Sequence, residues 1–395
     1  MFVGIPATIR QSGRNMIRVL LMSPLAGRDP LSGDTSYTES LLQQPPLGVQ
    51  YTPYDEALRN GTLLIRGRRR HHGAQTIEDL VILAARAVEQ GLRRSQFMFR
   101  EQYGYVTVKP GVFDLLHAHL FSVRQIGSSL PVVSSAGYPL NVLYQERDHW
   151  RPTHAALALK SEYLAARLCK VDVPWLATRA PGVMTVYTEH FRNWLIARGI
   201  PAERILLAGT ALPEVSLHDK RSDGRTLGFI GRDFNRKGGP VALAALRLVR
   251  QVDPTWHMIV VTSNRYGVVS GEPGVEMMYD VARHDLLSAV LPRLDILLLP
   301  TSSDCGAPYG LLEALHSGVH AVISDLPWLD SRLRPPAVSR MSPDPVKIAN
   351  YVAQLSNLDL QQSQLAAREL WQEHFAMNVL HTDLLRAYEL ALSQS

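Results

Sequence analysis

Arg232, Arg236 and Lys237 follow a short apolar run and have the side-chain types that bind an anion. Arginine binds phosphate through two parallel hydrogen bonds, and lysine adds a point charge. Gly238 and Gly239 come next, and they allow the backbone to approach a ligand ahead of a predicted helix N-terminus. The pattern therefore indicates a site for a diphosphate, although a solvated basic turn has the same residues. It lacks the Gly-Lys-Ser/Thr triplet of a P-loop.

A second group of polar residues stands at 295–325, in the stretch DILLLPTSSDCGAPYGLLEALHSGVHAVISD. Pro308, Tyr309 and Gly310 lie where a helix is predicted to begin, so backbone amides there can donate to phosphate. Glu313 follows in the same helix, where its carboxylate can accept hydrogen bonds from the two hydroxyls of a ribose. Considered alone, a glutamate that interacts with the helix dipole is the simpler explanation.

The elements that must hold these residues alternate between short apolar runs and amphipathic stretches. Strands are predicted at 16–25, 48–53, 112–120, 130–137, 182–187, 204–209, 227–230, 257–262, 275–279, 295–300 and 320–325. Helices are predicted after a cap at 34–36, at 76–92 and 155–170, at 189–200 after a cap at Thr188, after Gly239, and at 286–294 and 309–318. Two long helices are predicted to end the chain. The alternation predicts an α/β fold with parallel sheets, whose ligands bind at the carboxyl ends of the strands.

The chain of 395 residues is long enough for two domains. The polar, patternless segment 212–226 is predicted to be a linker between a domain at 16–211 and a second at 227–370. Residues 1–15 are predicted to be an N-terminal extension, and 371–395 a C-terminal helix.

Composition narrows the class of protein. With 46% hydrophobic residues the chain is not generally disordered, and its net charge of +5 favours anionic partners without indicating nucleic acid. Cys169 and Cys305 are the two cysteines and have no CxxC spacing, which argues against a zinc site or a disulfide framework and favours a reducing cytoplasm. No apolar run is long enough for a membrane-spanning helix.

The two motifs, in this order, resemble the nucleotide-binding half of retaining glycosyltransferases of family 4. Those enzymes have the GT-B fold, in which two Rossmann-like domains face a central cleft. The resemblance implies that Arg232 and Lys237 hold the donor diphosphate, with Arg236 as their neighbour. It also implies that 16–211 is the acceptor domain, that 227–370 is the donor domain, and that the C-terminal helix crosses back to the first domain.

The stretch CGAPYGLLEAL is similar to the family's Glu-x7-Glu motif from Gly306 onward. Glu313 falls on the second glutamate, which is the ribose ligand. Cys305 falls on the first glutamate, which lies against the donor sugar, and a thiol does not replace it as an acceptor. Asp304 stands one residue earlier and would supply the carboxylate after a shift of the loop.

The amino-terminal half resembles the same family at two places. FDLLHAHL is similar to its D-x-x-H-x-H segment, in which the second histidine, here His119, faces the donor sugar near the reacting carbon. Without that resemblance, a histidine packed at a strand end is the simpler interpretation, and His117 is expected to pack in this way. LSGDTSYTESLL resembles the first glycine loop, with Gly33 as the candidate for close approach to the donor and Asp34 and Thr35 beside it.

The activity that the resemblance implies is transfer of a hexose from a UDP-, GDP- or ADP-sugar to an acceptor, with retained anomeric configuration. No metal and no further cofactor is implied, because cationic side chains take the place of the ion. Two alternatives remain: a nucleotide-sugar-binding protein without turnover, motivated by Cys305, and a sugar-nucleotide epimerase on the same fold.

Because the basic loop is expected to be exposed, Lys237→Ala is expected to reduce activity much more than stability.

The acceptor is left open between a small molecule, a glycan and a lipid. Basic clusters at 65–75 and 92–100 lie in the predicted acceptor domain, and the second mixes arginine with aromatic residues. Such a cluster fits peripheral contact with an anionic inner membrane, and a solvated basic face is the alternative. The stretches 260–267 and 276–287 are predicted to line the pocket of the base.

Overall fold

The computed structural model describes most of the chain. The described residues are 16–23, 33–65, 103–119, 122–127, 129–137, 182–214, 219–263 and 271–394, with single positions between 151 and 160. Several predictions concern residues outside these ranges. They are the extension at 1–15, the helix at 76–92, the basic cluster at 92–100, most of the cluster at 65–75, most of the helix at 155–170 and part of the stretch 260–267.

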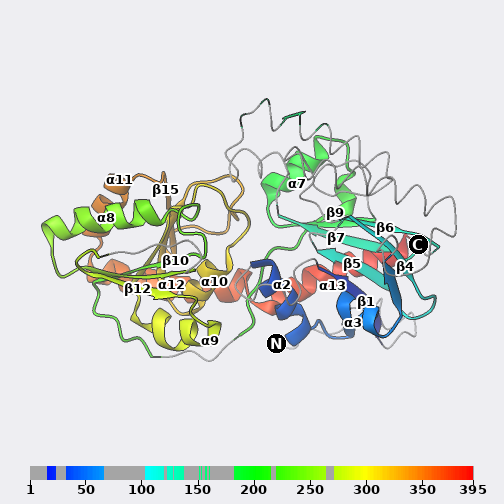
Figure 1. Cartoon of the computed structure of the whole chain (residues 1–395). Helices are drawn as coiled ribbons and strands as arrows, with labels where there is room; N and C mark the ends of the chain where they lie inside the picture. The colour runs from blue at the N-terminus through cyan, green and yellow to red at the C-terminus, as the bar shows by residue number, and fades with distance from the viewer. Residues whose placement is uncertain are drawn as a thin grey trace. The chain divides into compact units, whose positions relative to one another are not determined.

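The chain divides into two compact units (Figure 1). The first unit consists of Met1–Pro30, Tyr37–Ala208 and His381–Ser395, and the second of Leu31–Ser36 and Gly209–Leu380. The change from the first to the second unit between Ala208 and Gly209 lies just before the predicted linker. The C-terminal residues His381–Ser395 belong to the first unit.

The second unit is built on a six-stranded, fully parallel sheet with the order β12-β11-β10-β13-β14-β15. Counted along the chain within this unit, the order is that of the dinucleotide-binding Rossmann fold. Its strands are β10 Thr226–Ile230, β11 His257–Thr262, β12 Val275–Tyr279, β13 Ile296–Leu299, β14 His320–Ser324 and β15 Val338–Met341. The strands are short apolar runs because both faces of the sheet are covered.

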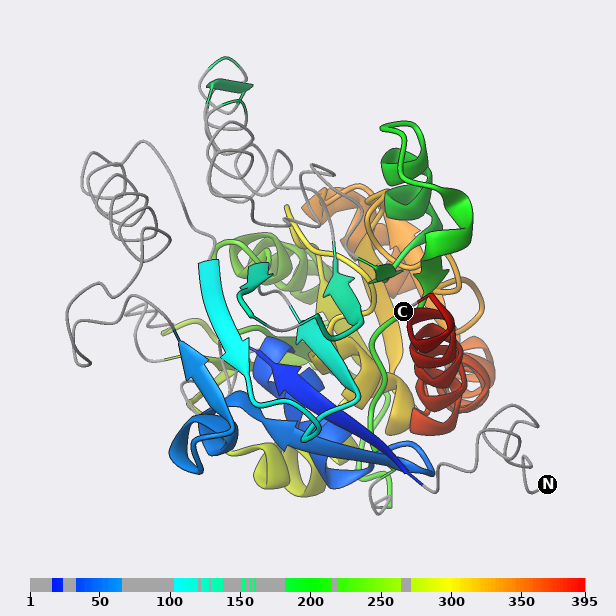
Figure 2. The same ribbon diagram turned by 90° about the vertical axis from the view of Figure 1, so that its right-hand side faces the viewer.

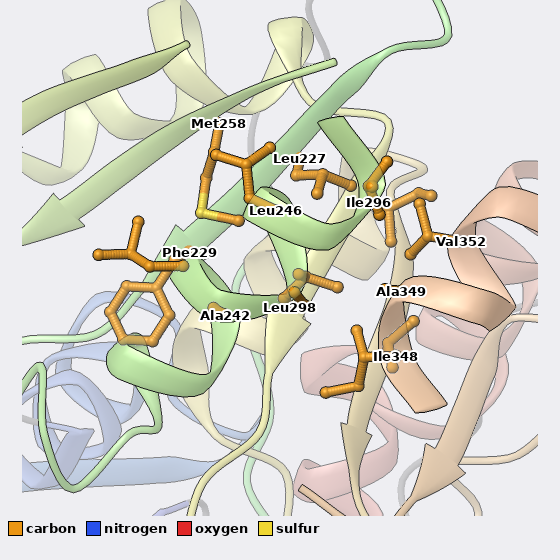
Figure 3. Packing of buried hydrophobic residues seen from close by; sticks show 14 of the residues in the cluster. Leu227, Phe229, Ala242, Leu246, Met258, Ile296, Leu298, Ile348, Ala349 and Val352 are labelled. Carbon is orange, nitrogen blue, oxygen red and sulfur yellow. The ribbon is translucent and has the colours of Figure 1, made fainter. Parts of the chain in front are cut away.

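Helices cover both faces of this sheet. In Figure 1, α8 (Gly239–Val252) and α11 (Pro345–Gln354) lie on one face, and α10 (Tyr309–His316) and α12 (Asn357–His374) on the other. The closing helix of the chain is α13 (Met377–Ser393). Figure 3 shows how side chains of β10, β11 and β13 pack against those of α8 and α11 in one buried cluster. Leu227, Leu298 and Ala242 are fully buried members, and this packing fixes the strand ends that carry the predicted site.

The first unit contains a second six-stranded parallel sheet, with the order β2-β1-β5-β7-β8-β9. Its strands are β1 Ile17–Met22, β2 Val49–Pro53, β5 Leu115–His119, β7 Val132–Ala136, β8 Val183–Val186 and β9 Ile205–Leu207. A small sheet of β3 (Leu63–Ile65), β4 (Tyr103–Val108) and β6 (Ser122–Gln125) accompanies it, and Figure 2 shows these blue to green strands from the side. The described helices that lie wholly within this unit are α3 Tyr54–Arg59, α7 Glu189–Ile196 and η3 Ala202–Arg204. Helix α2 (Gly33–Gln43) belongs to this unit from Tyr37 onward.

The prediction of an α/β fold with parallel sheets is confirmed, and so is the Thr188 cap, which accepts the amide of Phe191 at the start of α7. Other predictions were wrong in detail. α2 begins at Gly33, ahead of the predicted caps. The predicted helix at 286–294 is instead a π-helical turn, η5 (Leu286–Val290), and a 3-10 turn, η6 (Leu291–Arg293), after α9 (Arg283–Asp285), because Pro292 lacks the amide that an α-helix needs. The small sheet, β15 and α11 have no counterpart among the predicted elements.

Candidate functional site

The basic loop lies at the topological switch point of the second unit. β10 has β11 on one side and β13 on the other, so the connections leave β10 and β13 in opposite directions. In open parallel sheets this divergence opens a crevice at the carboxyl ends of the two strands, where ligands bind. The loop at 231–238 follows β10, and the loop at 300–308 follows β13. Both predicted motifs therefore meet at one edge of one sheet.

The backbones of these two loops touch at Gly238. Its φ of 85° lies in the left-handed region, and it caps the N-terminus of α8. A Cβ atom there would lie 2.0 Å from the carbonyl oxygen of Pro300, so no other residue fits this contact. The close approach that the sequence predicted for this glycine is thus an approach of one loop to the other.

Gly238→Ala is expected to lower the free energy of unfolding by about 2 kcal/mol or more, because it adds a backbone clash to the strain of positive φ. Gly224→Ala is the matched control: it has a φ of 81° in the same unit, and its Cβ would meet only Asn357 Oδ1 at 3.5 Å. Urea-induced unfolding of both variants measures the difference. Equal losses would show that the contact with Pro300 is not tight.

Arg236 joins the two loops through hydrogen bonds. Its carbonyl oxygen accepts the amide of Ser302 at 3.1 Å, and its guanidinium Nη1 donates to the carbonyl oxygen of Ser303 at 2.8 Å. Asp233 holds the arginine from within the loop, by accepting its amide at 3.1 Å and by an ion pair with Nε at 3.4 Å. Arg236 is therefore a half-buried residue whose side chain is oriented by the loop after β13.

Lys237 forms an ion pair with Asp304, one of the predicted carboxylates. The two side chains are only 16% and 13% exposed, so the expectation of an exposed lysine was wrong. Asp304 Oδ1 also accepts the amide of Cys305 at 3.3 Å. The carboxylate expected near the donor sugar thus contacts the cation expected on the diphosphate, and an incoming phosphate would compete with it for Lys237.

Arg232 is half-buried at the start of the same loop. Its carbonyl oxygen accepts the amide of Ser263 at 3.4 Å and the hydroxyl of Thr262 at 3.3 Å, which ties the loop to the end of β11. All three predicted cations therefore belong to one loop whose backbone is fixed by neighbouring strand ends. Cations on a loop with a fixed backbone suit a polyanion better than those of a flexible surface turn do.

The second motif places a helix N-terminus and a carboxylate at the same edge. Pro308 precedes α10 with extended backbone angles, and Tyr309 and Gly310 form its first turn, as predicted. Glu313 lies one turn further on and is buried, at 5% exposure. Its Oε1 is 3.0 Å from Arg283 Nε. Burial raises the pKa of Glu313 to about 7, although the charge of Arg283 acts in the opposite direction.

His119 ends β5 in the first unit, at the carboxyl edge of that sheet. It is fully buried, and its ring stacks on that of Tyr37 with centroids 4.1 Å apart. Neither ring nitrogen has a hydrogen-bond partner among the described residues. Burial, together with His117, lowers the pKa of His119 well below its ordinary value, so its imidazole is neutral.

His117 lies within a buried polar chain, in agreement with the expectation that it packs. Its Nδ1 is 2.8 Å from Tyr388 Oη, and its Nε2 is 2.5 Å from Ser135 Oγ. The chain continues from Tyr388 to Tyr51 Oη at 2.7 Å and from Ser135 to Thr185 Oγ1 at 2.8 Å. Burial lowers the pKa of His117 to about 3, so the ring is neutral and serves the structure by linking α13 to the sheet.

Tyr388→Phe is expected to lower the free energy of unfolding by about 1–3 kcal/mol, because it leaves a buried ring nitrogen of His117 unpaired and removes the partner of the half-buried Tyr51 hydroxyl. Tyr51→Phe is the matched control and should cost less, since Tyr388 keeps its contact with His117. Urea-induced unfolding of the two variants tests the order. A larger loss in Tyr51→Phe would show that the contact between Tyr388 and His117 contributes little to stability.

The first glycine motif lies at the beginning of α2. Gly33 is the first residue of this helix, and Asp34 and Thr35 follow within it. The predicted role of Gly33 and Asp34 toward a donor stays a prediction. His119 and the two loops belong to different units, and each is described within its own unit.

Several residues beside these groups were not predicted as site residues. Asp233 lies in the basic loop three positions before Arg236. An acidic residue at this spacing from an arginine indicates an ion pair between them. Arg283 lies in the stretch 276–287 that was predicted to line the base pocket, but nothing in the sequence links it to Glu313. Tyr37 and Tyr388 lie on helices far along the chain from β5, and only the fold brings them there.

Comparison with known proteins agrees with this geometry. Residues 224–357, about a third of the chain, match the profile of the family described as Glycosyl transferases group 1. Sucrose-phosphate synthase from Thermosynechococcus elongatus superposes with a TM-score of 0.62 at 12% identity, over 96% of this chain and 100% of that one. The chain has the GT-B fold.

Two further GT-B structures are similar over nearly the whole chain. A glycosyltransferase from Rickettsia africae has a TM-score of 0.53 and 10% identity, over 96% of this chain and 100% of its own. The Anabaena protein HepE, in complex with UDP and glucose, has a TM-score of 0.54 and 11% identity, over 94% and 99%. No curated protein sequence matches the chain. Within the described residues, every helix is too short or too polar to cross a bilayer.

Proposed function

We propose that the chain transfers a hexose from a nucleoside diphosphate sugar to an acceptor with retention of anomeric configuration. The observation that carries the proposal is the meeting of both motifs at the switch point of the second unit. There, Arg236 and Lys237 stand on one loop and the N-terminus of α10 on the other. Cations and helix amides at one edge are suited to a diphosphate.

The reaction breaks the bond between the anomeric carbon and the diphosphate oxygen and forms a bond from that carbon to an acceptor oxygen. The proton of the acceptor passes to the departing diphosphate on the same face, so no separate strong base is needed. Negative charge grows on the diphosphate as the bond breaks. Arg232, Arg236 and Lys237 stabilise that charge, together with the amides of Tyr309 and Gly310, and no metal ion or further cofactor is required.

Glu313 is proposed to hold the ribose of the donor. It lies on α10 one turn after the amides that face the phosphate, and it is buried, so a hydrogen bond to it is strengthened by the low local dielectric. The ionised carboxylate is the stronger acceptor of hydrogen bonds from hydroxyl groups, and Arg283 favours that form.

His119 is proposed to contact the donor sugar. Its two ring nitrogens are buried without partners among the described residues, and a buried polar group of this kind gains from a ligand that supplies a hydrogen bond. Positive charge develops at the anomeric carbon during the reaction, and a neutral imidazole does not repel it. Tyr37 holds the ring by stacking.

One observation favours the second candidate, a nucleotide-sugar-binding protein without turnover. The motif has Cys305 in place of its first glutamate, and the neighbouring Asp304 carboxylate contacts Lys237. In that case the residues that bind the diphosphate would be present, while the set of groups that acts on the sugar would be incomplete.

A panel of UDP-, GDP- and ADP-sugars tests the proposal, with UDP-glucose first because the Anabaena neighbour is described with UDP and glucose. Release of the nucleoside diphosphate is measured with and without glycan, lipid and small-molecule acceptors. Turnover with a product of the same anomeric configuration supports the transferase. A rise in melting temperature with a donor but no turnover with any acceptor supports the binding protein, and no response to any donor contradicts both.

A further inference from the structure

Arg283 is the nearest charged partner of the candidate ribose ligand. It comes directly after β12, at the same carboxyl edge as the two loops, and opens the short helix α9. Its Nε lies 3.0 Å from Glu313 Oε1, and the side chain is 28% exposed, against 7% for that of Glu313. The arginine is therefore the more exposed member of this ion pair.

The pairing of Arg283 with Glu313 is incomplete. The Nη2 atom of Arg283 is buried, and no acceptor for it exists among the described residues. An unpaired guanidinium donor out of reach of water is costly, so the position gains from any acceptor that reaches it. A donor that lacks a partner thus lies beside a carboxylate that accepts hydrogen bonds.

This arrangement is complementary to a vicinal diol. One hydroxyl can donate its proton to Glu313, and the oxygen of the next hydroxyl can accept from Arg283 Nη2. A carboxylate alone offers only acceptors and treats both hydroxyls alike. An Arg–Glu pair offers one donor and one acceptor and so distinguishes the two hydroxyls.

We propose that Arg283 and Glu313 together bind the ribose diol of the nucleotide, with Arg283 donating to one hydroxyl and Glu313 accepting from the other. Arg283 is then a specificity-determining residue that selects ribonucleotides over deoxyribonucleotides. This inference rests on the proposed function, because it takes the ligand of this edge to be a nucleoside diphosphate.

The experiment is a titration of the full-length protein with the one among UDP, GDP and ADP that most raises its melting temperature, and with the 2′-deoxy and 3′-deoxy forms of that nucleotide. The proteins are the wild type, Arg283→Gln, Glu313→Gln and the control Arg293→Gln. Arg293 also pairs with a glutamate, Glu276, but this pair is on the exposed surface of the same unit.

Arg283→Gln should weaken binding of the ribonucleotide by about tenfold, the usual size of a lost hydrogen bond to a charged group. It should weaken one of the deoxy forms by less than about twofold, because that form already lacks the hydroxyl that Arg283 serves. Glu313→Gln should show the same behaviour with the other deoxy form. Arg293→Gln should leave all three affinities at the wild-type values.

Equal losses for all three ligands in Arg283→Gln would overturn the inference and would leave the proposed function standing, since the nucleotide still binds. An unchanged affinity for all three ligands would overturn it in the same way. If none of UDP, GDP and ADP raises the melting temperature of the wild type, the proposed function fails, and the inference fails with it.

Discussion

Lys237→Ala is expected to lower kcat/KM for the donor sugar by about 10²- to 10³-fold, the usual loss when one fixed group that stabilises a developing negative charge is removed. The reason is geometric: Lys237 stands on the loop after β10 and contacts Asp304 in the loop that leads into α10, where the diphosphate would leave. Initial rates of nucleoside diphosphate release at several donor concentrations measure the effect.

Stability is the necessary control for this variant, because Lys237 is largely buried against Asp304. Removing the lysine leaves a poorly exposed carboxylate without its partner, so the melting temperature should fall. The double variant Lys237→Ala/Asp304→Asn removes that charge and should recover most of the melting temperature, with activity still far below that of Asp304→Asn alone. Lys347→Ala removes a lysine from α11 in the same unit and should change neither quantity. If activity returned along with the melting temperature, Lys237 would have a structural role only.

Glu313 is expected to give the donor affinity a pH dependence centred near pH 7, since burial raises the pKa of Glu313 to about 7. The ionised form accepts hydroxyl protons of the ribose, so affinity should rise between pH 6 and pH 8. Glu313→Gln should bind more weakly at pH 8 and should lose this rise. Titration of the ligand's phosphate affects both proteins equally. The difference between their affinities at each pH therefore reports on Glu313.

The same pKa predicts the sign of a stability effect. Between pH 4.5 and pH 7 the native chain keeps the Glu313 proton that the unfolded chain has released, so wild-type stability falls as the pH increases through this window. Above pH 7 the penalty is constant, at an order of about 3 kcal/mol. Glu313→Gln has no such penalty, so its free energy of unfolding should rise relative to the wild type from pH 5 to pH 7. A difference that does not change with pH would contradict the assignment.

Much of the fold could be predicted from the sequence because the strands of both sheets are short apolar runs. The run at 257–262 is β11 to the residue, and Thr188 caps α7 as predicted. Elements with weak patterns were missed, among them the four-residue strand β15. The stretch 286–294 has a helical pattern, but Pro292 within it breaks the helix.

Only part of the candidate site is predictable from the sequence. The order of the motifs predicts that the basic loop and the start of α10 lie at strand ends, and the sheet order brings them to one switch point. The pairing of individual side chains was not predictable. Lys237 and Asp304 are joined by sheet topology, and Arg283 reaches Glu313 from a different strand end. These contacts depend on the packing of loops, which carries no periodic signal in the sequence.

We propose that the edge formed by the loops after β10 and β13 binds the diphosphate of a nucleotide. The most direct measurement is a crystal structure of the protein with whichever of UDP, GDP and ADP most raises its melting temperature. We expect phosphate oxygens within hydrogen-bond distance of Lys237 and the amides at the start of α10, with the ribose on Glu313. A nucleotide bound elsewhere, with Lys237 still paired to Asp304 and no ligand at this edge, would contradict it.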